Sequence, residues 1–129
     1  MSRKVLIVDD SPISRKMLKS CFPQGHTYEI HEAGDWLAGL EKYKELRPDI
    51  TFMDLTMPVM DGEQAFHMLH GIRPDTPVLL SSGFSATEVV GRLNHFGLAG
   101  FVRKPYTRKT LLREVVRLGI TTQDLDFTI

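Results

Sequence analysis

Short apolar segments alternate with segments of helical periodicity along most of the chain, and this alternation limits the fold more than any other feature. The apolar segments predict five strands, at residues 5–8, 28–31, 50–53, 78–81 and 99–102. Several of them are almost continuously apolar, which is typical of parallel strands buried on both faces. Strands that alternate with helices in this way predict an α/β fold, a doubly wound parallel sheet of five strands with helices on both faces.

The segments between the strands carry apolar residues three or four positions apart, as the buried face of a helix does. In chain order these residues are Ile13, Met17 and Cys21; Trp36, Leu40 and Tyr43; Ala65, Leu69 and Ile72; Ala86, Val89, Val90 and Leu93; and Leu111, Val115 and Leu118. Pro12 stands where the first turn of a helix accepts proline, and Gly97 stands where a helix commonly ends. We therefore expect five helices that pack these faces against the sheet.

The composition limits the chain to one ordinary globular domain. It has 129 residues, of which 42% are hydrophobic and 25% are charged, enough for one core and too few for two. Because the formal net charge is zero, we expect no direct binding to nucleic acid and no attraction to a membrane surface. Cys21 is the single cysteine, which excludes an internal disulfide and suits a cytoplasmic location. The periodicity is lost near the end, so we assign the domain to residues 1–119 and leave residues 120–129 as an unassigned tail.

Three carboxylates follow predicted strands of the sheet. Asp9 and Asp10 come directly after the first strand, and Asp54 comes directly after the third. Because the carboxyl ends of parallel strands meet at one edge of the sheet, where such folds bind ligands, we expect the three side chains to lie close together. Their mutual repulsion calls for a cation, and carboxylate oxygens suit Mg²⁺ or Mn²⁺.

The other strand ends supply groups of complementary chemistry. Ser81 and Ser82 end the fourth strand, and Lys104 follows the fifth. A metal, an ammonium group and a hydroxyl donor are what a transferring phosphoryl group needs, because its chemistry depends mostly on positioning and on neutralising charge. Asp54 can serve as the nucleophile by forming an acyl phosphate.

Taken together, these residues resemble the receiver domain of two-component response regulators. The resemblance rests on the acid pair after the first strand, on the residues that follow Asp54, and on the ends of the last two strands. These residues are Asp9, Asp10, Asp54, Met57, Pro58, Asp61, Gly62, Ser82, Phe101, Lys104 and Pro105. It covers residues 3 to 118, almost the whole chain. It implies the flavodoxin-like strand order 2-1-3-4-5 and a phosphorylation-dependent switch that catalyses only its own phosphorylation and dephosphorylation.

The resemblance implies a role for each site residue. Asp54 would be the phosphoacceptor, taking a phosphoryl group from a histidine of a sensor kinase or phosphotransfer protein. Asp10, Asp54 and the backbone carbonyl of Thr56 would bind Mg²⁺, with Asp9 acting largely through water. Lys104 would pair with the phosphoryl oxygens.

The resemblance also implies a path from the site to the surface. Ser82 would move to hydrogen-bond the phosphate, and Phe101 would rotate inward with it. The surface of the fourth helix, the fifth strand and the fifth helix would then change for a downstream protein or output domain, or in a phosphorylation-dependent homodimer. Thr56 and Phe84 would flank the approach of water and tune dephosphorylation.

Other interpretations of the same residues remain open at this stage. Asp10 or Ser11 could simply cap the first helix. An Mg²⁺-dependent phosphatase of the haloacid dehalogenase type also uses aspartate on a doubly wound sheet, although its first-strand acids are separated by one residue and those here are adjacent. A constitutive interaction module without phosphorylation is the third alternative. The basic segment at residues 102–117 favours a solvated helix face or a protein-docking surface over a nucleic-acid site.

Overall fold

The computed structural model describes residues 3–22, 28–54, 62–82, 87–104 and 107–118. Within these residues it contains a sheet of strands β1 to β5 in the order β2-β1-β3-β4-β5, and every neighbouring pair is parallel. The bounds are β1 Arg3–Val8, β2 Tyr28–Ala33, β3 Ile50–Asp54, β4 Val78–Ser82 and β5 Gly100–Arg103. The predicted fold class and strand order are thus confirmed, with each observed strand within two residues of its predicted bounds.

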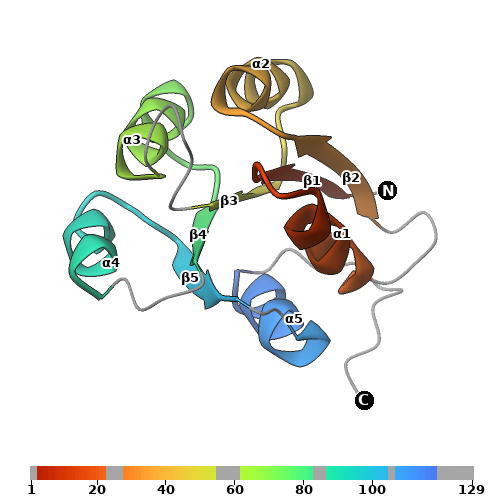
Figure 1. Cartoon of the computed structure of the whole chain (residues 1–129). Helices are drawn as coiled ribbons and strands as arrows, with labels where there is room; N and C mark the ends of the chain where they lie inside the picture. Colours follow the sequence, from red (N-terminus) through yellow and green to blue (C-terminus); the bar gives the residue numbers. More distant parts are fainter. Residues whose placement is uncertain (1–2, 23–27, 55–61, 83–86, 105–106, 119–129) are drawn as a thin grey trace.

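Helices cover both faces of this sheet (Figure 1). Their bounds are α1 Pro12–Ser20, α2 Trp36–Leu46, α3 Gly62–Ile72, α4 Thr87–Asn94 and α5 Arg108–Arg117. One core cluster lies between the sheet and α2, α3 and α4, and a second lies between the sheet and α1 and α5. Successive strand residues alternate between the clusters: Leu6 and Val8 belong to the first, and Val5 and Ile7 to the second. This alternation explains why the strands are apolar on both faces.

The register of the central strands sets the level at which the acids emerge from the sheet. Val8 of β1 pairs with Met53 of β3, so the next residues, Asp9 and Asp54, leave the two strands side by side. Asp54 in turn pairs with Ser81 of β4. The parallel register alone therefore brings these polar side chains to one edge of the sheet.

The first helix begins as its sequence predicts, but it buries a different face. Ser11 is the N-cap, and its hydroxyl accepts a hydrogen bond from the Ser14 N–H at 3.2 Å. Cys21 is buried as expected, whereas Ile13 is 73% exposed and Met17 is 39% exposed. Positions four apart advance by about 40° around a helix of 3.6 residues per turn, so that row turns away from the sheet. Leu18, which is 1% exposed, fills the core position instead.

A similar correction applies to α3. Ala65 and Leu69 are buried as predicted, but Ile72 is 39% exposed and Phe66 is buried in its place. Ile72 is the last residue of the helix, where the chain leaves the sheet. The predicted tail at residues 120–129 lies outside the described residues. Over the part of the chain that is described, no helix is both long and apolar enough to cross a membrane.

Candidate acidic site

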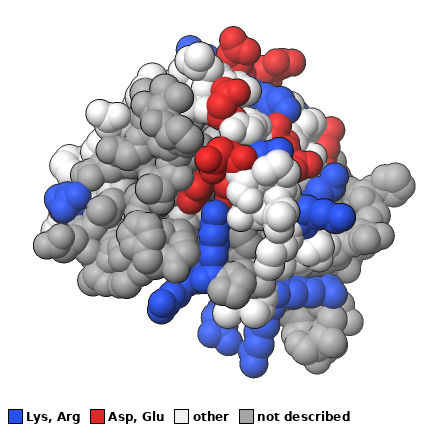
Figure 2. Space-filling view, in the orientation of Figure 1, with Lys and Arg blue, Asp and Glu red and all other residues white. Residues whose placement is uncertain are grey.

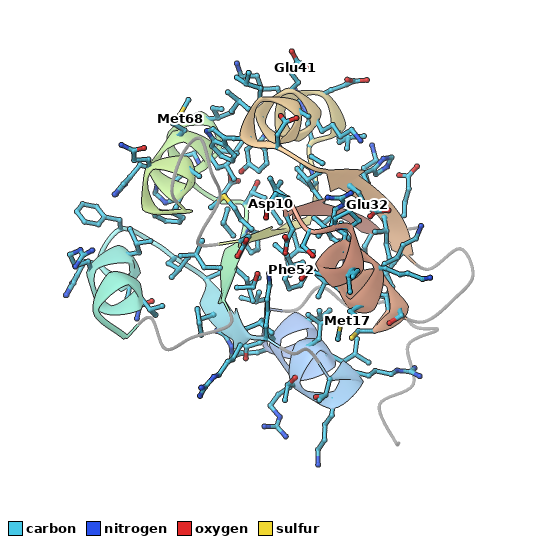
Figure 3. All side chains as sticks on the ribbon, viewed as in Figure 1. Asp10, Met17, Glu32, Glu41, Phe52 and Met68 are labelled. Atoms are coloured by element: carbon cyan, nitrogen blue, oxygen red, sulfur yellow. The ribbon has the colours of Figure 1, made fainter. Side chains whose placement is uncertain are left out.

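Three carboxylates and one lysine converge where β1, β3 and β5 end. Asp9, Asp10 and Asp54 each have a carboxylate oxygen within 4.8 Å of the others. Lys104 Nζ lies 2.9 Å from Asp9 Oδ2 and 3.6 Å from Asp54 Oδ1. Asp9 and Asp54 are buried, at 2% and 6% exposed, whereas Asp10 is exposed. Figure 3 labels Asp10 near the central strands, and of the three acids it is the one exposed to solvent.

Asp9 is held by its backbone as well as by its side chain. Its N–H donates to the Ala33 carbonyl at 3.0 Å, which extends the pairing of β1 and β2 by one residue. Its Oδ1 atom accepts a hydrogen bond from the Ser11 N–H at 2.9 Å. Because the N-cap is Ser11, neither acid of the pair is used to cap α1. The capping alternative is therefore correct for Ser11 and wrong for Asp10.

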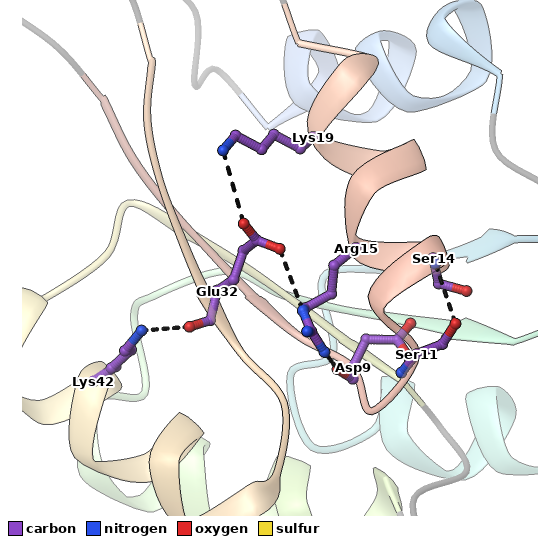
Figure 4. Close-up of polar contacts among 7 residues, drawn as sticks. All are labelled: Asp9, Ser11, Ser14, Arg15, Lys19, Glu32 and Lys42. Carbon is purple, nitrogen blue, oxygen red and sulfur yellow. Dashed lines mark hydrogen bonds and ion pairs between the residues drawn. The ribbon is translucent and has the colours of Figure 1, made fainter.

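A cluster of charged side chains fastens the Asp9 backbone to β2 and α1 (Figure 4). The Arg15 guanidinium donates to the Asp9 carbonyl and, from Nε, to Glu32 Oε1 at 3.2 Å. Lys19 Nζ lies 3.8 Å from Glu32 Oε2. The side chain of Arg15 is only 18% exposed. This bridge orients the turn that carries both acids.

Arg15 and Glu32 were not identified from the sequence. The available signal was weak, because Glu32 is one of two acids in β2 and the other, Glu29, is exposed. Nothing in the spacing links Arg15 to Asp9, because the contact forms only when α1 folds back beside β1. Gly34 contributes to the fit, since a Cβ atom there would lie 3.2 Å from Arg15 Nη1.

The ends of the last two strands carry the remaining predicted residues. Ser82 is the last residue of β4 and pairs with Arg103 of β5. Phe101 is half-buried and packs against the core cluster beneath α2, α3 and α4. Thr56, Phe84 and Pro105 lie outside the described residues. The structure thus brings Asp9, Asp10, Asp54 and Lys104 together. It places Phe101 in β5, three residues before Lys104.

The donor set fits a small divalent cation. Three carboxylates whose oxygens lie within 4.8 Å of one another offer the hard oxygen ligands that such ions prefer. Two of the three are buried, and the single charge of Lys104 beside them compensates only part of their charge. The residues present therefore form an acidic pocket able to bind a metal.

The fold and this pocket first define a class. A doubly wound sheet of order 2-1-3-4-5, with polar side chains gathered at the carboxyl ends of its strands, is the flavodoxin-like architecture that binds ligands at this edge. More specifically, the chain belongs to the response regulator receiver domain family, whose model matches residues 5–116.

Individual relatives agree with this assignment. The chain is 36% identical over 106 residues to the chemotaxis protein CheY of Thermotoga maritima, covering 82% of this chain and 88% of the relative. It is 30% identical over 115 residues to CheY of Bacillus subtilis, covering 89% and 96%. Among solved structures, the chemotaxis response regulator CheY4 of Vibrio cholerae superimposes with a TM-score of 0.80 at 30% identity, covering 92% of this chain and 99% of that one.

The family establishes the general function. Receiver domains of the CheY type are phosphorylation-dependent switches of two-component signalling, and the alternative of a haloacid dehalogenase phosphatase is not supported. A longer relative, the regulatory protein AtoC of Escherichia coli, is matched over only 22% of its length. Domains of this kind therefore occur both as short proteins and within longer ones.

Proposed function

We propose that Asp54 is the phosphoacceptor of this switch. The observation that carries the proposal is the convergence of three carboxylates and Lys104 at the carboxyl end of the sheet. An Asp54 carboxylate oxygen attacks the phosphorus of a phosphohistidine, the P–N bond breaks, and the imidazole leaves with the electron pair and takes up a proton. The product is an acyl phosphate on Asp54. The phosphohistidine belongs to a sensor histidine kinase or to a phosphotransfer protein.

Mg²⁺ is the cofactor we assign to the pocket, and Mn²⁺ has the same ligand preferences. Asp10, Asp54 and the Thr56 carbonyl would hold the ion, with Asp9 contributing largely through water. When bound, the ion neutralises charge on the phosphoryl oxygens. Lys104, which follows β5, would balance the same charge. Its contacts with Asp9 at 2.9 Å and Asp54 at 3.6 Å support this role.

We propose that Ser82 and Phe101 couple phosphorylation of Asp54 to a conformational change at the surface. Ser82 would donate a hydrogen bond to the phosphoryl group, and Phe101 would move further into the core. Support comes from the position of Phe101, which is half-buried against the core and adjacent to the strand that ends in Ser82. The surface of α4, β5 and α5 would then present the altered state to a downstream protein, to an output domain or to a second copy of the chain.

The remaining assignments complete the proposal. We take residues 1–119 as the domain and residues 120–129 as a tail, place the protein in the cytoplasm, and expect its only catalysis to be its own phosphorylation and dephosphorylation. Thr56 and Phe84 would flank the water that hydrolyses the acyl phosphate. Phe84 is bulky and apolar, so we expect slow hydrolysis and a long-lived signal.

Labelling with a small phosphodonor tests the central assignment. With acetyl phosphate and Mg²⁺, we expect intact-mass spectrometry to show one added phosphoryl group on the wild-type chain and none on Asp54→Asn. Asp10→Asn is the matched control, because it removes the same charge but keeps the acceptor; it should be labelled more slowly and still at Asp54. Undiminished labelling of a folded Asp54→Asn variant would refute the assignment.

The proposed coupling has its own test. Ser82→Ala should still accept the phosphoryl group, while the amide chemical shifts around Phe101 should no longer change on phosphorylation. Shifts at Phe101 that match those of the phosphorylated wild type would contradict the coupling.

A further inference from the structure

Every polar atom of Asp9 has a partner in the described part of the chain. Its backbone N–H donates to the Ala33 carbonyl at 3.0 Å, and its Oδ1 accepts a hydrogen bond from the Ser11 N–H at 2.9 Å. Its Oδ2 lies 2.9 Å from Lys104 Nζ. The remaining polar atom, the backbone carbonyl oxygen, accepts a hydrogen bond from the Arg15 guanidinium (Figure 4). Arg15 therefore completes the set of contacts that fix Asp9.

The contact with Arg15 reaches Asp10 through the backbone. A peptide unit is planar, so the carbonyl oxygen of Asp9 and the Cα atom of Asp10 lie in one plane. Holding that oxygen therefore restricts the position from which the Asp10 side chain starts. Asp10 has no hydrogen bond or ion pair with another described residue, although one of its carboxylate oxygens lies within 4.8 Å of an oxygen of Asp9 and of Asp54. The place of Asp10 in the pocket consequently depends on the backbone that carries it.

Arg15 is itself held in place by β2. Its Nε atom donates to Glu32 Oε1 at 3.2 Å, and Glu32 pairs in register with Ile7 of β1. The Arg15 side chain is 18% exposed, and a Cβ atom at Gly34 would lie 3.2 Å from its Nη1 atom. The guanidinium group thus has little room to move, and it ties the turn of Asp9 and Asp10 to the sheet.

Charge does not explain this arrangement by itself. Arg15 is paired with Glu32, so the two side chains together add no net charge beside the pocket. Figure 2 shows Lys and Arg side chains interspersed among the Asp and Glu side chains in the upper part of this face. A guanidinium group presents its N–H donors in a fixed plane and can serve a carbonyl and a carboxylate together, whereas a lysine ammonium is a compact point charge. Geometry is therefore what Arg15 supplies to the turn.

We propose that Arg15 is a positioning residue that gives the acidic pocket its preference for Mg²⁺ over Ca²⁺. The proposal rests on the proposed function, because it concerns the metal that we assign to the pocket. Mg²⁺ requires near-octahedral ligands at about 2.0–2.1 Å, whereas Ca²⁺ accepts flexible geometries at about 2.3–2.6 Å. A turn that holds Asp10 close to Asp9 favours the smaller ion. When the turn is loosened, the carboxylates can spread, and the affinity for Mg²⁺ falls more than the affinity for Ca²⁺.

Titration of the metal-free chain with two metals tests the proposal. Isothermal titration calorimetry with MgCl₂ and with CaCl₂ gives the Kd for each ion, and the ratio of the Kd for Ca²⁺ to the Kd for Mg²⁺ measures the preference. The variants are Arg15→Met, which removes the guanidinium, and Arg15→Lys, which keeps the charge and the aliphatic stem. The matched control is Lys19→Met, because Lys19 also lies on α1 and 3.8 Å from Glu32 but is 55% exposed.

We expect Arg15→Met to raise the Kd for Mg²⁺ by about tenfold or more and the Kd for Ca²⁺ by less than about threefold. The ratio should fall similarly in Arg15→Lys, since an ammonium group does not reproduce the planar fork, and this variant tests the same point if Arg15→Met does not fold. The ratio of Lys19→Met should stay within about twofold of wild type. A ratio unchanged in Arg15→Met, a ratio restored by Arg15→Lys or an equal fall in Lys19→Met would each overturn the proposal. A general loss of stability weakens the binding of both ions alike, so it leaves the ratio unchanged.

Labelling by acetyl phosphate separates this inference from the proposed function. Arg15 contacts the turn and not Asp54, so at saturating Mg²⁺ the Arg15→Met variant should be labelled at Asp54 within about threefold of the wild-type rate. Labelling of the wild type together with an unchanged metal ratio in the variants would refute the role of Arg15 alone. A changed ratio without any labelling of the wild type would uphold that role and refute the phosphoacceptor assignment. A wild type that binds neither ion would refute both the assigned cofactor and this inference.

Discussion

Lys104 is the residue whose replacement tests the electrostatics of the acidic pocket most directly. Replacing it with methionine keeps most of the side-chain volume and removes the charge that faces Asp9 at 2.9 Å and Asp54 at 3.6 Å. At an effective dielectric constant of 20, each of these contacts corresponds to roughly 5 kcal/mol of attraction before the cost of burying the charges. The variant leaves three carboxylates close together without that compensation.

The net loss of stability is smaller than the gross attraction. Removing one partner of a buried ion pair typically costs about 3–5 kcal/mol, and the Lys104 side chain is 20% exposed, so we expect roughly 2–4 kcal/mol. With a typical urea m-value of about 2 kcal/mol/M, the unfolding midpoint in EDTA should fall by about 1–2 M. Lys16→Met is the matched control, because Lys16 is exposed on α1; it should change the free energy of unfolding by less than about 0.5 kcal/mol.

Mg²⁺ supplies the second half of this experiment. An ion in the pocket replaces the missing positive charge, so saturating Mg²⁺ should recover more than half of the stability that Lys104→Met loses. Saturation at about 100 times the Kd corresponds to about 2.7 kcal/mol, which is more than half of the expected loss. If Lys104→Met is as stable as Lys16→Met in EDTA, or if its deficit is the same with and without Mg²⁺, then the three acids do not repel one another as the distances indicate.

Further predictions concern other positions of the chain. Asp10→Ala removes the exposed acid of the pocket. It should raise the urea midpoint of unfolding in EDTA and weaken Mg²⁺ binding by more than about tenfold. If Mg²⁺ stabilises this variant as much as the wild type, the metal binds elsewhere. Gly39→Ala should destabilise by about 1–2 kcal/mol, because its Cβ would lie 2.9 Å from a buried valine methyl group of β1 and overpacking outweighs the gain in helix propensity. Gly91→Ala, with no atom within 4 Å of its Cβ, should instead stabilise the fold by about 0.5–1 kcal/mol, measured by urea unfolding. Equal effects of Gly39→Ala and Gly91→Ala on the free energy of unfolding would refute the packing argument. Thr56→Asn with Phe84→Glu should shorten the lifetime of the acyl phosphate by about tenfold or more, measured after removal of the donor with Mg²⁺ saturating; a lifetime that is unchanged or longer would show that water access is controlled by other residues.

Most of the fold could be predicted from periodicity, because buried parallel strands and amphipathic helices impose their own repeats on the sequence. The position of Asp54 at the end of β3 followed from the same pattern, and the register of Val8 with Met53 confirms why it meets Asp9. The helix faces were less well predicted. Ile13 and Met17 fit the helical spacing but are exposed, since the spacing of apolar residues alone does not say which row of a helix faces the sheet.

The sequence by itself determined which acids and which lysine reach the same edge of the sheet. Strand ends, acid positions and the lysine after the last strand are all local features, and the parallel arrangement brings them together. The tertiary structure alone decided how that chemistry is held and where it leads. Arg15 contacts the Asp9 carbonyl only because α1 packs beside β1. Lys104 contacts Asp9 only because the sheet brings the end of β5 within reach of the end of β1. Such contacts join distant segments through side-chain direction and helix rotation, and neither property is encoded in the spacing of residues along the chain.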